Sequence, residues 1–443
     1  MPSLGLGYLA SVLRNKGHDV KILHSLKEKF NFKDFIRYIK ENDFDLIGIQ
    51  MFTFDLTPTK KHIKIIKKLS PNTTIVLGGY HPSGDPEGTL EFFSDVDFIF
   101  SGEAEIGLPK LVETLEKNKN DFKDVPNLVW RNNGKIIKNP WKLIENLDEI
   151  PFPAWDLMDP RTYPEAPHGG FFKSFPNAPI IITRGCPMQC TFCAGKSVTG
   201  NKVRKRSVKN VIEEIKYLKN KFGVNDFLIE DENFTLHKDL VKEFCETLIK
   251  NNLNIHWSCP SGVRIDTLDK EMLKLMEKAG CYYLSIGIEF GSQRIHDLTK
   301  KHLTLEKIKE KIDLFKYVNI RTAGFFMMGI PGETKEEMIK TINFSKQLRI
   351  DRAQFNNFMP LPGSALYKEL REKGMEEIDY DHFFVHDVGF VPEGMTKKEM
   401  KKLQRKAYLE FYLRPRIILS LLKDLTSFKQ FFRLFKRFID GLK

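Results

Sequence analysis

Short apolar runs of strand length alternate with amphipathic helical segments along most of this 443-residue chain. Strands that alternate with helices favour a parallel sheet covered by helices. Two such series occur, one over residues 4–116 and a second, with six strand–helix units, over residues 180–358. The sequence therefore predicts an α/β protein, and its length favours two or three domains.

The first series predicts a doubly wound, Rossmann-like domain over residues 1–125. Expected helices cover residues 4–15, 32–41 and 58–69, and expected strands cover residues 19–23, 45–49, 74–79 and 96–100. Ligands of such sheets bind beyond the carboxyl ends of the strands. Residues 126–172 are expected to form a connector, with a hairpin turn at residues 132–135 and a proline-rich extended segment at residues 147–156.

The second series predicts a partial (β/α)6 barrel over residues 173–394. Its expected strands cover residues 180–183, 226–230, 255–258, 283–288, 322–328 and 353–358, and its expected helices cover residues 208–221, 240–251, 270–279, 305–317 and 335–347. In barrels the active site forms at the carboxyl ends of the strands. Acidic and glycine-rich segments follow several of these strands, so we expect the functional residues at this edge.

Three closely spaced cysteines, Cys186, Cys190 and Cys193, form a C-x3-C-x2-C triplet after the first of these strands. Thiolates are soft ligands that favour iron–sulfur clusters, zinc or copper(I). Three thiolates leave one iron of a four-iron cluster open to an outside ligand. Zinc is disfavoured because no His or fourth Cys completes a nearby pair, and three structural thiols are the remaining alternative.

The other three cysteines, Cys245, Cys259 and Cys281, show no metal-ligand spacing. No pattern indicates a disulfide framework, which fits a reducing compartment. The N-terminus lacks the charged and apolar regions of a signal peptide, and no apolar run approaches the ~20 residues of a spanning helix. We therefore expect a cytoplasmic protein.

The cysteine triplet, with Phe192 just before its last member, resembles that of the radical SAM superfamily. The resemblance extends over residues 2–374. It implies a [4Fe-4S] cluster on the three cysteines, S-adenosylmethionine (SAM) on the open iron, anaerobic chemistry, and an electron donor of the flavodoxin or ferredoxin type. It also implies that SAM contacts fall on Phe192, Asp231, Glu232, Arg264, Glu289, Gly329 and Pro331. A surface salt bridge is the alternative for Arg264, and a helix cap is the alternative for residues 333–334.

Four segments of the first domain, residues 2–10, 16–20, 78–82 and 102–105, resemble in order the cobalamin-binding domain that precedes many radical SAM cores. The resemblance implies cobalamin contacts at Leu4, Gly5, Gly78, Gly79, His81, Gly102 and Glu103. The D-x-H-x-x-G motif is absent, so no protein His is expected below the cobalt. A Rossmann-like domain that binds nothing is the alternative.

The family domain normally has a central strand before the position of Pro2. Its absence predicts either a misplaced start codon or a truncation that leaves a strand edge unpaired. The latter would destabilise the domain.

Together the two resemblances imply a cobalamin-dependent radical SAM enzyme. The expected reaction is methylation of an unactivated carbon in a lipid, isoprenoid or other secondary metabolite, through a 5′-deoxyadenosyl radical. Oxidative cyclisation or ring rearrangement, of the porphyrin-ring-forming type, and a non-catalytic cobalamin or cluster sensor are the alternatives. A methylthiotransferase is disfavoured because no second cysteine set lies in the N-terminal domain.

The C-terminal residues 395–443 carry most of the net charge of +12, with 14 Lys and Arg against 4 Asp and Glu. Phenylalanines at helical spacing over residues 428–438 alternate with basic residues, which predicts a basic amphipathic helix. Such a helix suits an anionic membrane surface. Packing on the protein's own core or on a partner subunit is the alternative, and no nucleic-acid partner is expected.

Overall fold

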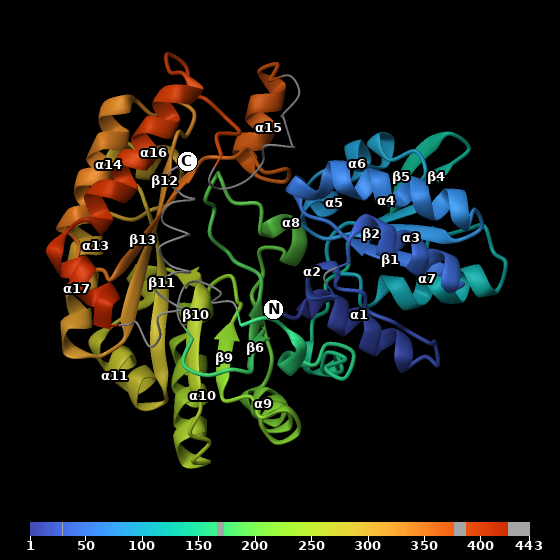
Figure 1. The fold of residues 1–443 in the computed structure, drawn as a ribbon, viewed down its shortest axis with the longest axis horizontal. Helices are drawn as coiled ribbons and strands as arrows, with labels where there is room; N and C mark the ends of the chain where they lie inside the picture. Colours follow the sequence, from blue (N-terminus) through green and yellow to red (C-terminus); the bar gives the residue numbers. More distant parts are fainter. Residues whose placement is uncertain (29, 166–171, 376–386, 424–443) are drawn as a thin grey trace.

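The computed structural model describes residues 1–28, 30–165, 172–375 and 387–423. Two α/β bodies lie side by side, the first in blue to teal and the second in green to orange in Figure 1. Each is built on its own sheet, of five and six strands. The predicted fold class is confirmed.

The first sheet has the strand order β1-β2-β3-β4-β5. Its strands are β1 (Leu46–Gln50), β2 (Thr74–Gly78), β3 (Phe98–Phe100), β4 (Leu128–Asn132) and β5 (Lys135–Lys138). The first three are parallel, β4 pairs antiparallel to β3, and β4 and β5 form the predicted antiparallel hairpin. The hairpin of the expected connector therefore extends the first sheet.

The helices of the first domain are α1 (Leu4–Arg14), α2 (Ser25–Glu28), α3 (Phe32–Glu41), α4 (Leu56–Leu69), α5 (Tyr80–Gly84), α6 (Pro86–Phe92) and α7 (Gly107–Glu116), with a 3-10 turn η1 (Thr53–Asp55). A reciprocal capping box between Asn31 and Asp34 starts α3. Buried Ile63, Ile66 and Leu77 pack α4 against the sheet.

The strand expected at residues 19–23 does not form, and this prediction was wrong. A strand needs a neighbour to complete its ladder of hydrogen bonds. Among the described residues β1 pairs with β2 alone, so no neighbour is available beyond it. The residues of β1 are half-exposed or exposed, whereas the middle of β2 is buried. Among the described residues, no strand pairs with the outer edge of β1.

The second sheet has the order β6-β9-β10-β11-β12-β13, and all its pairs are parallel. Its strands are β6 (Asn177–Ile180), β9 (Asp226–Ile229), β10 (His256–Val263), β11 (Cys281–Glu289), β12 (Arg321–Met328) and β13 (Arg352–Asn357). Neighbours in space are consecutive in the series, as in a barrel wall. Within the described residues β6 and β13 are not joined, which makes the barrel partial.

The helices of this core are α9 (Val208–Phe222), α10 (Lys238–Lys250), α11 (Lys270–Lys278), α12 (Gln293–Leu298), α13 (Leu305–Ile312), α14 (Lys335–Gln347) and α15 (Ala365–Glu372). Its 3-10 turns and those of the connector are η2 (Leu147–Glu149), η3 (Pro160–Thr162), η4 (Phe234–Leu236), η5 (Ile265–Thr267) and η6 (Asp313–Tyr317). Gly223, at φ +73°, ends α9 in the left-handed conformation that glycine tolerates.

Two C-terminal helices, α16 (Lys397–Tyr412) and α17 (Pro415–Lys423), belong to the core and not to a separate tail. The Tyr412 hydroxyl accepts from the Ala353 amide at 3.2 Å and donates to the Ala353 carbonyl at 2.8 Å. The Gln404 side chain donates to the Phe355 carbonyl at 2.8 Å. These contacts cover the free edge of β13, which corrects the boundary expected at residue 395. The predicted basic helix over residues 428–438 lies outside the described residues.

Helix α1 joins the two bodies. Leu4 and Tyr8 belong to the same buried apolar cluster as Trp155, Met158 and Ile180 of the connector and core. None of the described helices combines the length and apolar content needed to span a bilayer.

Candidate cluster and cofactor site

The three cysteines lie on one closed loop. Strands β7 (Thr183–Arg184) and β8 (Arg204–Lys205) pair antiparallel and form its neck. The residues between them, here called the cysteine loop, include the short helix α8 (Lys196–Thr199). Gly185 has φ +97°, and a Cβ there would collide with the Lys202 carbonyl, so only glycine suits this turn.

Cys186 and Cys190 are half-buried and Cys193 is exposed. Burial raises the pKa of Cys190, while the nearby cations Lys301 and Arg264 oppose that rise. Although Cys193 is exposed as a residue, withdrawal of its thiol from water raises its pKa, and Cys190 and Cys186 add to the rise. The Gly195 amide donates to Cys193 Sγ at 3.4 Å.

These residues fit a [4Fe-4S] cluster better than a single ion. Within the described ranges no three His, Cys, Asp or Glu side chains converge as ligands of one metal ion would. In a four-iron cluster each thiolate binds a different iron, so the sulfurs stay apart. Three thiols on one loop would supply the thiolate ligands of such a cluster, and the amide directed at sulfur and the two nearby cations would stabilise its negative charge.

The acidic pair after β9 divides between two roles. Asp231 is buried and accepts from the Ile182 and Thr183 amides, both at 2.8 Å. Burial raises the pKa of Asp231 to about 7. Glu232 is half-buried and accepts from Thr199 Oγ1 at 2.7 Å, at the cysteine loop. Of the two predicted SAM contacts, Asp231 has both oxygens engaged in holding the base of the loop, and Glu232 is the more accessible.

Arg264 is engaged inside the core. Its guanidinium donates to Asp266 at 3.0 and 2.9 Å and to the Lys301 carbonyl at 3.0 Å. Arg264 thus forms a salt bridge, as the alternative to a SAM contact expected, but its guanidinium is buried and does not lie on the surface.

A buried ion pair, not anticipated from the sequence, lies beside the thiols. Glu289 has φ +68°, a strained value for a residue with a side chain, and its Oε1 lies 2.9 Å from Lys301 Nζ. That ammonium is 5.9 Å from the ring centroid of Phe192. Nothing in the local sequence distinguishes Lys301 from the other lysines, so only the tertiary structure identifies it.

The loop after β12, which contains the predicted SAM contacts Gly329 and Pro331, also meets the cysteine loop. Phe192 packs against an apolar cluster that contains Phe290 and Ile330. The Gly329 and Ile330 amides donate to Glu333 Oε2 at 2.6 and 3.1 Å. The structure thus brings Phe192, Glu289 and the loop that contains Gly329 and Pro331 to one end of the core.

Thr334 is the N-cap of α14. The alternative of a helix cap is therefore confirmed for that residue.

At the corresponding edge of the first domain, three aromatic rings form a stack. Phe52 stacks on Phe54 with centroids 5.4 Å apart and on Tyr80 with centroids 5.7 Å apart. Phe54 is 41% exposed and Tyr80 is 45% exposed. Although the residue as a whole is 45% exposed, withdrawal of its hydroxyl from water, with added repulsion from Glu232 and Cys193, raises the pKa of Tyr80 to about 12. Helix α5, which begins at Tyr80, packs against α8 of the cysteine loop.

The glycines predicted to contact cobalamin differ in what surrounds them. Gly78 has open space on its side-chain face, as a bulky ligand would need, whereas Gly79 at φ +106° abuts the Met51 backbone. A Cβ on Gly5 would lie 3.7 Å from Gln50, and Gly102 is covered by the Trp141 ring, 2.6 Å from such a Cβ. Gly78 is thus the most open of the four.

Leu4 and His81 point into the protein. Leu4 packs in the apolar cluster under α1. His81 is buried, its Nδ1 lies 3.2 Å from Thr53 Oγ1, and burial lowers its pKa to about 4, so its ring is neutral. Their role at cobalamin is reduced to shaping the edge of the domain.

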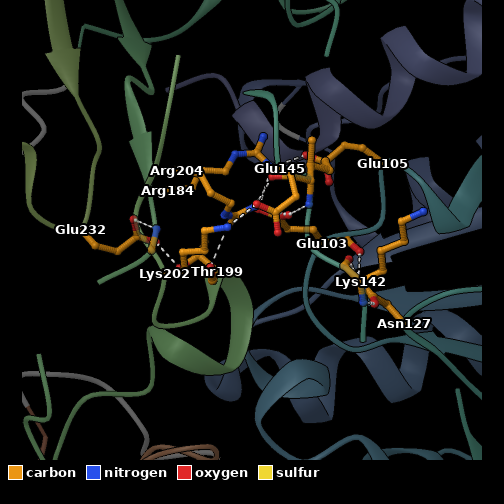
Figure 2. Close-up of polar contacts among 12 residues, drawn as sticks. Glu103, Glu105, Asn127, Lys142, Glu145, Arg184, Thr199, Lys202, Arg204 and Glu232 are labelled. Carbon is orange, nitrogen blue, oxygen red and sulfur yellow. Dashed lines mark hydrogen bonds and ion pairs between the residues drawn. The ribbon is translucent and has the colours of Figure 1, made fainter. Parts of the chain in front are cut away.

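Glu103 is engaged between the domains (Figure 2). Its carboxylate accepts from Arg184 at 3.2 Å, from Arg204 at 2.6 Å and from the Ile144 amide at 3.0 Å. Glu105 lies 2.7 Å from Arg184. Both oxygens of Glu103 are satisfied within the protein, which removes the expected basis for a direct contact with cobalamin.

Comparison with known proteins agrees with these two sites. Residues 180–345 match the family described as Radical SAM superfamily, and residues 1–112 match the B12 binding domain. An uncharacterized methyltransferase, PH0819, of Pyrococcus horikoshii is 33% identical over 443 residues, which cover 100% of this chain and 93% of that protein.

An anaerobic magnesium-protoporphyrin IX monomethyl ester cyclase of Cereibacter sphaeroides is 28% identical over 93% of this chain and 67% of its own length. The solved structure of the radical SAM methyltransferase TsrM from Kitasatospora setae, with cobalamin and a [4Fe-4S] cluster bound, aligns with a TM-score of 0.70. The alignment has 18% identity and covers 88% of this chain and 80% of TsrM. This chain belongs to the radical SAM superfamily, as an enzyme that combines a B12-binding domain with the radical SAM core and uses a [4Fe-4S] cluster, SAM and cobalamin.

Proposed function

We propose that this enzyme methylates an unactivated carbon of a lipid, isoprenoid or other secondary metabolite. The observation that carries the proposal is the approach of the two strand edges, since α5, which begins at Tyr80 beyond β2, packs against α8 of the cysteine loop. When bound, the cluster and SAM supply a carbon-centred radical, and cobalamin supplies the methyl group. Two relatives described as methyltransferases support this reaction.

The residues of the chain bind and orient. Cys186, Cys190 and Cys193 hold the cluster. Glu232 offers a carboxylate to the SAM amino group, and Lys301 offers a positive charge beside the thiolates. The stacked rings at the first-domain edge provide an apolar surface for a large planar ligand.

The test is an anaerobic incubation of the reconstituted enzyme with dithionite, cob(I)alamin and SAM labelled with 13C in its methyl group, with and without a total lipid extract. We expect methylcobalamin and S-adenosylhomocysteine without the extract, and labelled lipid together with 5′-deoxyadenosine when it is present. Formation of 5′-deoxyadenosine without any methylated product would contradict methyl transfer and favour the cyclase-type reaction of one relative.

We also propose a flavodoxin or ferredoxin as electron donor and a cytoplasmic location with peripheral membrane contact. Leu413 at the end of α16 and Leu419 in α17 are exposed, and basic residues follow them in the sequence. Apolar and basic groups together favour an anionic membrane surface. Purified protein should sediment with anionic vesicles and not with neutral ones, and failure to sediment with either at low salt would contradict the membrane contact.

A further inference from the structure

The neck of the cysteine loop carries two arginines that face one another across the strand pair. Arg184 in β7 is the direct partner of Arg204 in β8, and all three cysteines lie between them in the chain. Both guanidinium groups reach the same carboxylate, Glu103 of the first domain (Figure 2). A single side chain of one domain therefore holds both ends of the loop of the other domain.

The network is buried and balanced in charge. The side chains of Arg184 and Glu105 are each 8% exposed, that of Glu103 is 3% exposed, and that of Arg204 is 1% exposed. Two positive charges thus meet two negative ones away from water. Buried charges are strongly unfavourable without their partners, so this arrangement depends on the two domains remaining in contact.

Glu103 lies at the ligand edge of the first sheet. It follows β3, just as Tyr80 follows β2 and Phe52 follows β1. The Gly102 amide donates to Ser83 Oγ of α5 at 2.9 Å, so this N–H group is already used within the protein. The edge that receives a ligand and the residue that grips the neck therefore belong to one connected structure.

On the other side, the network continues to the cofactor end of the core. Arg204 donates to the Thr199 carbonyl at 2.7 Å, and the Thr199 hydroxyl donates to Glu232 at 2.7 Å (Figure 2). The Arg184 side chain also lies over the Tyr8 ring, 5.0 Å from its centroid. The neck is thereby fixed relative to both cofactor edges.

We propose that Glu103 is a positioning residue that sets the separation between the cluster on the cysteine loop and cobalamin in the first domain. It does so by holding Arg184 and Arg204 together at the neck. The inference rests on the two cofactors and not on the identity of the product, so it is independent of whether the reaction is methylation or cyclisation.

The test measures a distance. A nitroxide label at the exposed loop position Lys202, introduced as Lys202→Cys, reports its separation from paramagnetic cob(II)alamin by pulsed electron resonance in the full-length holoenzyme. We expect one narrow distance distribution in the parent. Glu103→Gln keeps the shape of the side chain but removes its charge, and it should broaden and lengthen that distribution while cobalamin and iron contents stay unchanged.

Asp156→Asn is the matched control. It breaks another ion pair that involves the first domain, Arg14 with Asp156, whose side chains are both 43% exposed. Exposed pairs contribute little, so the parent distribution should persist in this control.

Three results would overturn the proposal. The first is a parent-like distribution in Glu103→Gln with both cofactors bound. The second is loss of cobalamin from Glu103→Gln with an unchanged iron content, which would place Glu103 in the cobalamin pocket itself. If Glu103→Gln does not fold, the same distance measurement is made on Arg204→Lys, which keeps the positive charge but loses the forked donors. An unchanged distance distribution in Arg204→Lys is the third result that would overturn the proposal.

Absence of cob(II)alamin from the parent would refute the cofactor assignment. Absence of methyl transfer with the distances intact would refute only the proposed reaction.

Discussion

The two sheets end in opposite chemistry at the same topological position. Beyond the parallel strands of the first sheet lie stacked aromatic rings, Phe52, Phe54 and Tyr80, with open faces. Beyond those of the second sheet lie thiols and the buried pair Glu289–Lys301. The α/β architecture provides a ligand edge in both cases, but the side chains decide that one edge suits a flat apolar ring and the other a charged cofactor.

The two sheets also differ in how well they are covered. Strand β11 is buried over nearly its whole length, whereas β1 has no buried residue. The free edge of β13 is covered by α16, but within the described residues the outer edge of β1 is not paired. The first sheet is therefore the less completely covered of the two.

The largest expected effect comes from removing one of the three thiols at the ligand edge of the core. Cys190→Ala should reduce bound iron and 5′-deoxyadenosine formation to background, because two thiolates do not hold the cluster. Cys245→Ala is the control, since this thiol is buried in α10, away from the cysteine loop. Iron analysis and anaerobic SAM cleavage give the measurement, and equal losses in both variants would contradict the assignment.

The next test removes one charge from the core edge. Lys301→Met leaves Glu289 buried without its partner and should lower the free energy of unfolding by about 3–5 kcal/mol. Adding Glu289→Gln should recover much of the loss, because the double variant buries no unpaired charge. Urea denaturation of the three variants and the parent gives the values, and a double variant as unstable as Lys301→Met would argue against the pairing.

A pH dependence separates the two edges further. Burial raises the pKa of Glu333 in the core to about 8, above its unfolded value of 4.5. The folded protein therefore retains a proton that the unfolded chain releases, so this contribution to stability is complete below pH 4.5 and is lost as the pH rises through about 8. The slope should be at most about 1.4 kcal/mol per pH unit. Glu333→Gln should flatten it in urea unfolding at pH 5, 6.5 and 8, and an unchanged slope would refute the role of this carboxyl.

The smallest effect concerns the aromatic edge. Tyr80→Leu removes one ring of the stack and should weaken cobalamin binding by up to about tenfold, since an aromatic pair contributes about 0.5–1.5 kcal/mol beyond its buried area. Tyr317→Leu is the control, because Tyr317 is similarly exposed, at 48%, on the core. Spectrophotometric titration of the apoprotein with cobalamin distinguishes them, and equal affinities would remove Tyr80 from the binding surface.

Local patterns in the sequence sufficed to predict both sheets and the β4–β5 hairpin, and to single out the three cysteines. Each of these depends on residues close together in the chain, such as the spacing of Cys186, Cys190 and Cys193, or on the regular alternation of strands and helices. Even so, the strand expected at residues 19–23 did not form, because a strand depends on a neighbour that local sequence does not specify.

The tertiary structure decided which side chains meet. Glu103 lies 81 residues before Arg184 and 101 before Arg204, and the three converge only when two domains dock. The same holds for Tyr412 at the edge of β13. The sequence by itself determined the two folds and the closely spaced cysteine triplet, because those follow from local periodicity and spacing. Only the tertiary structure showed that Glu103 binds the neck and that Lys301 lies beside the thiols, because the partners of these buried charges are distant in the sequence and meet only in the folded protein.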